Sequence, residues 1–261
     1  MHYMTETAKI LMLGDIVADS GLQAVKEKLP ALLAESGAVL CVCNGENAAS
    51  GFGITKENAE LLLDAGVDVI TSGNHIWEKD GIKELLQSEA RLLRPANYPA
   101  IAPGQGHIIV QKAGFGFAVV NLQGRENMRP IDSPFDVADS LLDRLSGDYI
   151  VIVDFHAESF AEKEALSLYL DGRVSVFAGT HTHVQTADER ILPKGCGYIG
   201  DLGMCGPVDS VIGVKTGPCI KRNLSQMPIR MESAEGHAML SGALFTVDRD
   251  KRCTEIMRIR I

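Results

Sequence analysis

Short apolar runs alternate with segments of helical periodicity along most of the chain. Runs with the length and flanking residues of buried strands lie at residues 9–13, 39–43, 67–71, 149–153 and 174–178. Apolar residues recur every three to four positions between them, which predicts helices at 21–35, 55–65, 79–88, 133–145 and 162–170. Pro30 is expected to end or bend the first helix, because proline lacks the amide hydrogen that a helix interior uses. This alternation is typical of α/β proteins.

Two further pairs of apolar segments read as β-hairpins. One joins residues 107–113 to 116–123, and the other joins 238–247 to 254–261, while the C-terminal third shows little helical signal. The pattern predicts the α/β class, with two β-sheets between helical layers in an αββα sandwich. Length alone allows one domain or two, and we interpret residues 1–261 as a single domain with residues 1–8 as a flexible leader.

Composition limits the classes of partner. Hydrophobic residues make up 46% of the chain and charged residues 23%, so it can bury a sizeable core. A net charge of −9 argues against binding of long nucleic acid, although bound cations could still make a cleft attractive to a small anion. No apolar run approaches the roughly 20 residues of a membrane span, and residues 1–8 lack the features of a secretory signal. We therefore expect a cytoplasmic protein without a membrane partner.

The chain has six cysteines, which could form disulfides, bind zinc or remain reduced. Cys41 and Cys43 alternate within an apolar run and lack the two-residue spacing of a zinc knuckle. They are expected to be reduced and buried.

Side chains able to bind metals follow five of the predicted strands. The loops concerned contain residues 14–15, 44–47, 72–75, 154–156 and 179–183. Because ligands of open α/β sheets gather at the carboxyl ends of strands, these loops are expected to converge. The alternative is a set of unrelated polar loop residues. Metal-capable side chains at five strand ends are, however, hard to explain by chance. The candidate metal ligands are Asp15, Glu46, Asn47, Asn74, His156, His181 and His183.

The mixture of carboxylate, carboxamide and imidazole donors indicates the kind of metal site. Such donors suit manganese, iron or zinc, whereas a structural zinc site would be expected to use thiolates. Seven donors exceed the need of one ion and suit two ions about 3.5–4 Å apart that share a carboxylate. A pair of this kind activates hydroxide and holds phosphate oxygens, so the pattern predicts hydrolysis of a phosphoester.

Three motifs resemble the calcineurin-like metallophosphoesterase superfamily, namely Gly14-Asp15, Gly73-Asn74-His75 and Gly179-Thr180-His181-Thr182-His183. Further segments resemble the narrower group of YmdB-like bacterial phosphoesterases: Asn44-Gly45-Glu46-Asn47-Ala48-Ala49, Gly51-Phe52-Gly53-Ile54-Thr55, Asp154-Phe155-His156-Ala157-Glu158 and His183-Val184-Gln185-Thr186-Ala187-Asp188. The similarity covers nearly the whole chain. It implies the αββα sandwich of the superfamily.

The resemblance also implies the roles of individual residues. Glu46 would bridge the two ions, with Asp15, Asn47 and His183 on one ion and Asn74, His156 and His181 on the other. Val17 stands where many members of the superfamily have a histidine, and Glu46 replaces their usual bridging aspartate; both departures fit the narrower group.

His75 directly follows the proposed ligand Asn74 and is the candidate general acid. Ile76 occupies the position at which the superfamily usually has an acidic residue, so another group must orient His75. Phe52 is a weaker candidate for binding substrate, by stacking on a nucleobase; packing against its own domain is the alternative.

The resemblance implies a phosphodiesterase that hydrolyses small cyclic nucleotides by attack of a metal-bound hydroxide. It also implies a homo-oligomer. Two alternatives stay open on the sequence. The same pocket could belong to a phosphomonoesterase or nucleotidase, or to a signalling receptor with slow turnover.

Overall fold

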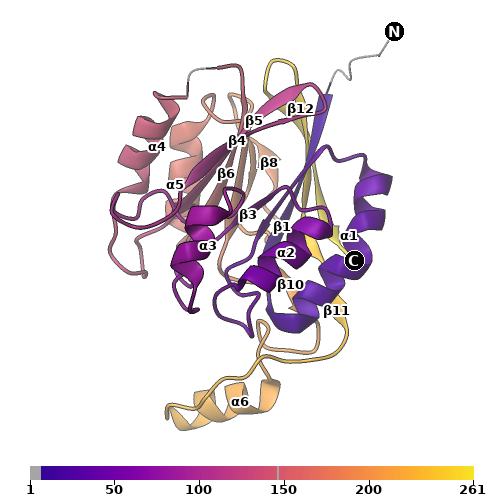
Figure 1. The fold of residues 1–261 in the computed structure, drawn as a ribbon, viewed down its shortest axis with the longest axis vertical. Coiled ribbons are helices and arrows are strands. Elements are labelled where there is room, and N and C mark those ends of the chain that lie inside the picture. The colour runs from indigo at the N-terminus through magenta and orange to yellow at the C-terminus, as the bar shows by residue number, and fades with distance from the viewer. Residues whose placement is uncertain (1–6, 146) are drawn as a thin grey trace.

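The computed structural model describes residues 7–145 and 147–261, which form two β-sheets packed face to face between helices (Figure 1). The first sheet has seven strands: β1 (Thr7–Ile16), β2 (Leu40–Asn44), β3 (Val69–Thr71), β10 (Met204–Pro207), β11 (Ala238–Met239), β12 (Ser241–Asp248) and β13 (Cys253–Arg260). The second has six: β4 (His107–Lys112), β5 (Phe115–Gln123), β6 (Ile150–His156), β7 (Val176–Thr180), β8 (Arg190–Ile191) and β9 (Gly197–Ile199). The helices are α1 (Ala18–Ser36), α2 (Lys56–Asp64), α3 (Ile82–Ser88), α4 (Pro134–Leu142), α5 (Phe160–Leu170) and α6 (Thr216–Ser225).

In the first sheet, β1 is central and runs parallel to β2 and to the short strand β10, while the C-terminal hairpin β12–β13 adds antiparallel strands. In the second, β5, β6, β7 and β9 are parallel, and β4 and β8 pair antiparallel at its two sides. The parallel strands of each sheet therefore end at a common edge. The predicted two-sheet sandwich and both predicted hairpins are confirmed.

Alternation along β1 shows how the layers are joined. Ile10 and Met12 face the second sheet in the core between the sheets, whereas Leu11 and Leu13 lie in a separate cluster with residues of α1 and α2. Both faces of the strand are buried, which explains why it reads as a continuous apolar run. A third cluster joins the outer face of the second sheet to α4 and α5 (Figure 1). Cys41 and Cys43 are free and fully buried, as expected.

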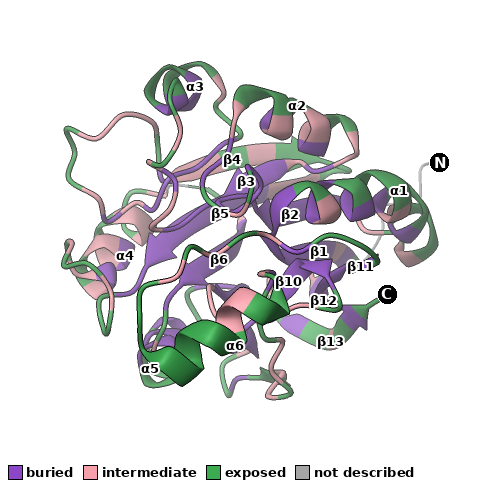
Figure 2. Ribbon diagram, turned by 90° about the horizontal axis from the view of Figure 1, so that it is seen from below, coloured by how far each residue is buried: buried purple, intermediate pink, exposed green. Residues whose placement is uncertain are grey.

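Three local expectations differ from the structure. Pro30 does not end α1, because it lies on the exposed face, where solvent can hydrate the carbonyl group left without a partner. Thr7 and Ala8, assigned to a leader, are the first residues of β1; residues 1–6 lie outside the described part of the chain. The C-terminal third contains a helix, α6, which projects beyond the sheets and has no buried residue (Figures 1 and 2).

Across the described residues, no helix has both the length and the apolar character needed to span a bilayer.

Candidate metal centre

The carboxyl ends of five parallel strands bring the predicted ligands to one place. Asp15 belongs to β1, Glu46 and Asn47 follow β2, and Asn74 follows β3; His156 ends β6, and His181 and His183 follow β7. The side chains of Asp15, Glu46 and His156 are completely buried between the two sheets. The contacts described below connect all seven residues.

Four donor atoms surround a single point beside His156. Its Nε2 atom lies 2.9 Å from Glu46 Oε1, 3.2 Å from Asn74 Oδ1 and 3.0 Å from His181 Nδ1. An imidazole nitrogen carries one hydrogen or one lone pair, so it cannot satisfy three neighbours at once. Glu46, His156 and His181 also form the cluster of metal-capable side chains whose donor atoms all lie within 4.8 Å of one another. This convergence of donor atoms fits a site that could hold a cation.

A second group of donors lies around His183. Its Nε2 is 3.0 Å from Asn47 Nδ2, which can donate to it, and 3.8 Å from Asp15 Oδ1. Its Nδ1 is 2.9 Å from the carbonyl oxygen of Ile212, which can only accept a hydrogen bond. Nδ1 therefore carries the hydrogen, and the Nε2 lone pair faces Asp15 and Asn47. This tautomer is the one a metal ligand requires.

The two buried carboxylates are used in the same way. Asp15 Oδ2 accepts a hydrogen bond from the backbone N–H of His181, and Glu46 Oε2 accepts one from the backbone N–H of His75. The other oxygens, Asp15 Oδ1 and Glu46 Oε1, are buried and accept no hydrogen bond from a described residue, although His156 Nε2 lies 2.9 Å from Glu46 Oε1. Because an unpartnered buried carboxylate oxygen is costly, these two atoms fit a site that holds cations.

Electrostatics supports the same interpretation. Burial raises the pKa of Asp15. Burial also opposes ionisation of Glu46, but His156 outweighs it and lowers the pKa of Glu46 to about 2. Burial alone would lower the pKa of His156, whereas the carboxylates of Glu46 and Asp15 raise it to about 9. The two carboxylates therefore favour a positive charge beside them, which a divalent ion would supply.

His156 is oriented by a pair of residues that the sequence did not single out. Its Nδ1 lies 3.0 Å from Thr180 Oγ1, whose hydroxyl donates to Asp154 Oδ1 at 2.8 Å. Nδ1–H donates to Thr180, so in a neutral His156, the form that binds a metal, the Nε2 lone pair faces Glu46 and His181. Asp154 could have been suspected because it lies two residues before His156 on β6, which places both side chains on one face of the strand.

Gly73 allows the end of β3 to approach His156 closely. A Cβ atom on Gly73 would lie 2.0 Å from the imidazole Cδ2, closer than any non-bonded contact. Only glycine fits between β3 and the ring, which gives a physical reason for the glycine before Asn74.

His75 lies at the rim of the centre, and the structure identifies the groups that orient it. Glu78 Oε1 is 3.5 Å from His75 Nδ1, and the Phe52 ring contacts the imidazole edge-on, with centroids 4.9 Å apart. The acidic residue expected directly after His75 is thus replaced by one three positions along the chain.

A buried ion pair holds the loop that contains His181 and His183. Lys163 Nζ of α5 lies 2.8 Å from Asp201 Oδ2, and both side chains are completely buried. Asp201 also accepts hydrogen bonds from the backbone N–H groups of Thr182 and Gly203, at 3.1 and 2.8 Å. His181 and His183, on either side of Thr182, both have positive φ angles, of 101° and 63°. Such strained conformations persist only where the surroundings fix them.

Two cavities open on the centre. The first, about 420 Å³, is lined by Phe52 together with Glu46, His75 and His181; the second, about 540 Å³, is lined by Asn74, His75 and His181. Phe52 is 44% exposed and faces the first cavity, so it is available to contact a ligand.

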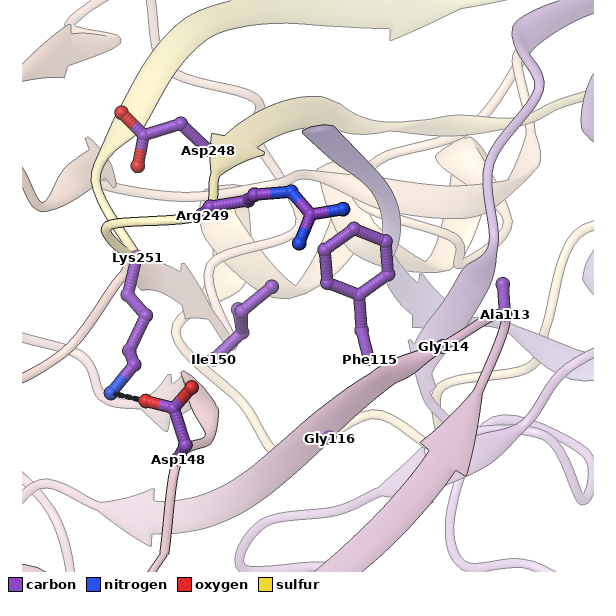
Figure 3. Close-up of a pocket in the computed structure, with 9 residues that line it drawn as sticks. All are labelled: Ala113, Gly114, Phe115, Gly116, Asp148, Ile150, Asp248, Arg249 and Lys251. Atoms are coloured by element: carbon purple, nitrogen blue, oxygen red, sulfur yellow. Dashed lines mark ion pairs between the residues drawn. The ribbon is translucent and has the colours of Figure 1, made fainter. Parts of the chain in front are cut away.

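A smaller hollow of about 150 Å³ lies at the opposite end of the sheets, beside the β4–β5 and β12–β13 turns (Figure 3). There Lys251 pairs with Asp148, and the Arg249 side chain extends towards Phe115 (Figure 3). None of the seven candidate ligands lines it.

Comparison with known proteins supports the identity of the fold. The chain is 44% identical, over 97% of both chains, to a Bacillus subtilis protein named 2′,3′-cyclic-nucleotide 2′-phosphodiesterase. A crystal structure of a hypothetical protein from Thermus thermophilus superposes with a TM-score of 0.92 at 39% identity, covering 97% of this chain and 98% of that one.

A second crystal structure, described as a novel phosphatase from Mycoplasma pneumoniae, gives a TM-score of 0.93 at 35% identity and covers 99% of this chain and 94% of that one. The sequence profile of the YmdB-like proteins matches residues 11–259. With the strand-end donors in the order that this resemblance implies, the chain belongs to the YmdB-like protein family.

Proposed function

We propose that this protein is a dinuclear metal-dependent phosphodiesterase that hydrolyses small cyclic nucleotides, with 2′,3′-cyclic nucleotides as the substrate class. The observation that carries the proposal is the pair of buried carboxylate oxygens, Asp15 Oδ1 and Glu46 Oε1, left without hydrogen-bond partners among imidazole and carboxamide donors. The substrate class follows the name of the Bacillus subtilis relative. Membership of the broader group of phosphoric ester hydrolases fits both the donors and the relatives.

The donors divide into two sets around Glu46. Asn74, His156 and His181 lie on the side of Glu46 Oε1 and would hold one ion, while Asp15, Asn47 and His183 would hold the other. Iron or manganese suits this mixture best, and zinc is also compatible. When bound, two such ions act as Lewis acids on phosphate oxygens and lower the pKa of water.

His75 would supply the proton for the departing ribose oxygen. It lines both cavities beside the centre, and its backbone N–H is fixed by Glu46. Glu78 Oε1 lies 3.5 Å from His75 Nδ1 and helps to keep the imidazole oriented. A proton donor at this position would reach a leaving group bound in either cavity.

Removal of metal tests the proposal as a whole. After chelation and gel filtration, elemental analysis should find no metal, and hydrolysis of 2′,3′-cyclic AMP should fall to background. Manganese or iron should restore hydrolysis up to about two ions per chain. Full turnover in protein shown to be free of metal would rule out the proposed function.

Substitution of His75 tests the general acid. His75→Ala should lower turnover of a cyclic nucleotide by about 10²–10⁴, the usual contribution of a positioned proton donor, with metal content unchanged. A nitrophenyl phosphodiester should lose much less, because nitrophenolate departs without a proton. An equal loss on both substrates, or loss of metal, would count against this role.

Phosphomonoester hydrolysis is the second candidate, because the Mycoplasma pneumoniae structure is described as a phosphatase. Product analysis separates the two activities. Accumulation of a nucleoside monophosphate indicates the phosphodiesterase, whereas release of inorganic phosphate indicates the monoesterase.

A further inference from the structure

The candidate metal centre lies at the junction of two cavities rather than at the bottom of one. We call them the Phe52 cavity, about 420 Å³, and the Arg129 cavity, about 540 Å³. His75 and His181 line both. Each volume falls within the range of about 300–1,000 Å³ that is usual for small-molecule sites. One cyclic mononucleotide therefore needs only one of the two.

The Phe52 cavity suits a nucleoside next to the reacting phosphate. Phe52 forms one wall. Ile212 and Val214, which precede α6, and Met231, which follows it, contribute apolar surface. An aromatic ring and apolar walls close to phosphate-binding groups are the usual surroundings of a base. If the phosphate lies at the candidate ligands, the nucleoside fits in this cavity, and no part of a mononucleotide needs the second one.

The Arg129 cavity offers different chemistry. Besides the residues of the metal centre, it is lined by Glu78 and residues 127–130. Arg129 and Pro130 also line an adjoining hollow of about 500 Å³, together with Trp77, Tyr98 and Asp132. Arg129 is exposed, and no described residue forms an ion pair or hydrogen bond with its side chain. The rings of Trp77 and Tyr98 pack edge-to-face, with centroids 5.3 Å apart. A guanidinium beside aromatic rings is the combination that binds the phosphate and base of a nucleotide.

The way in which a 2′,3′-cyclic phosphate forms suggests which ligand the second cavity binds. Such a group forms when a ribose 2′-hydroxyl attacks the adjacent phosphodiester and expels the next nucleotide, so it arises at the 3′ end of a cleaved RNA. The nucleotide that bears it is normally joined through its 5′ oxygen to another nucleotide. A site for the terminal group alone would leave that upstream nucleotide without contacts.

We propose that the substrate is the 3′ end of a short RNA bearing a 2′,3′-cyclic phosphate, with the terminal nucleoside in the Phe52 cavity and the upstream nucleotide in the Arg129 cavity. This inference rests on the proposed function. Arg129 contacts the phosphate that joins the two nucleotides, and Trp77 with Tyr98 forms the surface for the upstream base.

The reaction is a hydrolysis that balances without a further reactant. Water adds its oxygen to phosphorus, the bond from phosphorus to O2′ breaks, and O2′ takes a proton from the site. The product is an RNA ending in a 3′-phosphate. An RNA-cleaving transesterification supplies the substrate, and removal of a 3′-phosphate is the class of reaction that would consume the product.

The charge of the protein limits the length of RNA that it recognises. The chain carries a net charge of −9, and the two joined cavities have room for two nucleotides. Additional phosphates would gain no attraction from a protein of net negative charge. A trinucleotide should therefore be no better a substrate than a dinucleotide.

The test compares 2′,3′-cyclic AMP with the dinucleotide ApA ending in a 2′,3′-cyclic phosphate, on metal-loaded protein. We expect kcat/KM to be about ten-fold higher for the dinucleotide, mainly through KM, which corresponds to one stacking or phosphate contact. Arg129→Ala should bring this ratio close to one. The matched control is Arg144→Ala, which removes an exposed guanidinium that lines neither cavity and should preserve the ratio.

The outcomes separate failure of this inference from failure of the proposed function. Hydrolysis of 2′,3′-cyclic AMP with no preference for the dinucleotide would overturn the inference and leave the proposed function intact. A ten-fold preference that survives Arg129→Ala would overturn the placement of the upstream nucleotide. Hydrolysis of neither compound would overturn the proposed function, and this inference with it.

Discussion

Glu46→Gln should reduce both bound metal and phosphodiesterase activity, with turnover falling by at least about 10³-fold. Glu46 is completely buried, and its Oε1 atom faces His156 at 2.9 Å without a hydrogen bond. Glutamine keeps the shape of the side chain but lacks the charge that would hold two cations together. Its amide oxygen can still accept the backbone N–H of His75, so the loop and the fold should survive.

Metal content by elemental analysis and turnover on the same preparation check this result. Glu60→Gln is the matched control, because Glu60 lies on the exposed side of α2 and pairs with Lys56 at the surface. Glu46→Gln protein that binds two ions and turns over at the wild-type rate would show that Glu46 does not bridge the ions.

Lys163→Met should lower the free energy of unfolding by about 3–5 kcal/mol, far more than substitution of an exposed lysine. The Lys163 ammonium and the Asp201 carboxylate are both buried and lie 2.8 Å apart. Removing the lysine leaves Asp201 charged and buried, with only backbone N–H groups as partners. The loop that carries His181 and His183 should loosen with it.

Urea unfolding in the presence of chelator measures the effect without a contribution from bound metal. Lys56→Met is the control, since the exposed pair of Lys56 and Glu60 should contribute less than about 1 kcal/mol. Lys163→Met combined with Asp201→Asn should recover part of the loss, because the pair is coupled. A loss below about 1 kcal/mol from Lys163→Met alone would contradict the structural role of the buried pair.

The sequence by itself determined the fold class and the neighbourhood of the candidate ligands. Apolar runs separated by helical periodicity predicted parallel strands, and parallel strands place their carboxyl ends at one edge. Asp15, Asn74 and His156 could therefore be assigned to one neighbourhood without coordinates. Their roles as ligands, and that of His75 as acid, remain predictions.

Only the tertiary structure decided which groups support the centre. Lys163 lies in a helical pattern in which a lysine is ordinarily solvated, yet packing of α5 on the second sheet buries it against Asp201, 38 residues away. Thr180 and Asp154 meet through the pairing of β6 with β7, and Glu78 reaches His75 through a turn. Periodicity reports which face of an element is apolar, whereas such pairs depend on how separate elements pack. The same reason explains why Pro30 remains inside α1 and why the Arg129 cavity was not foreseen.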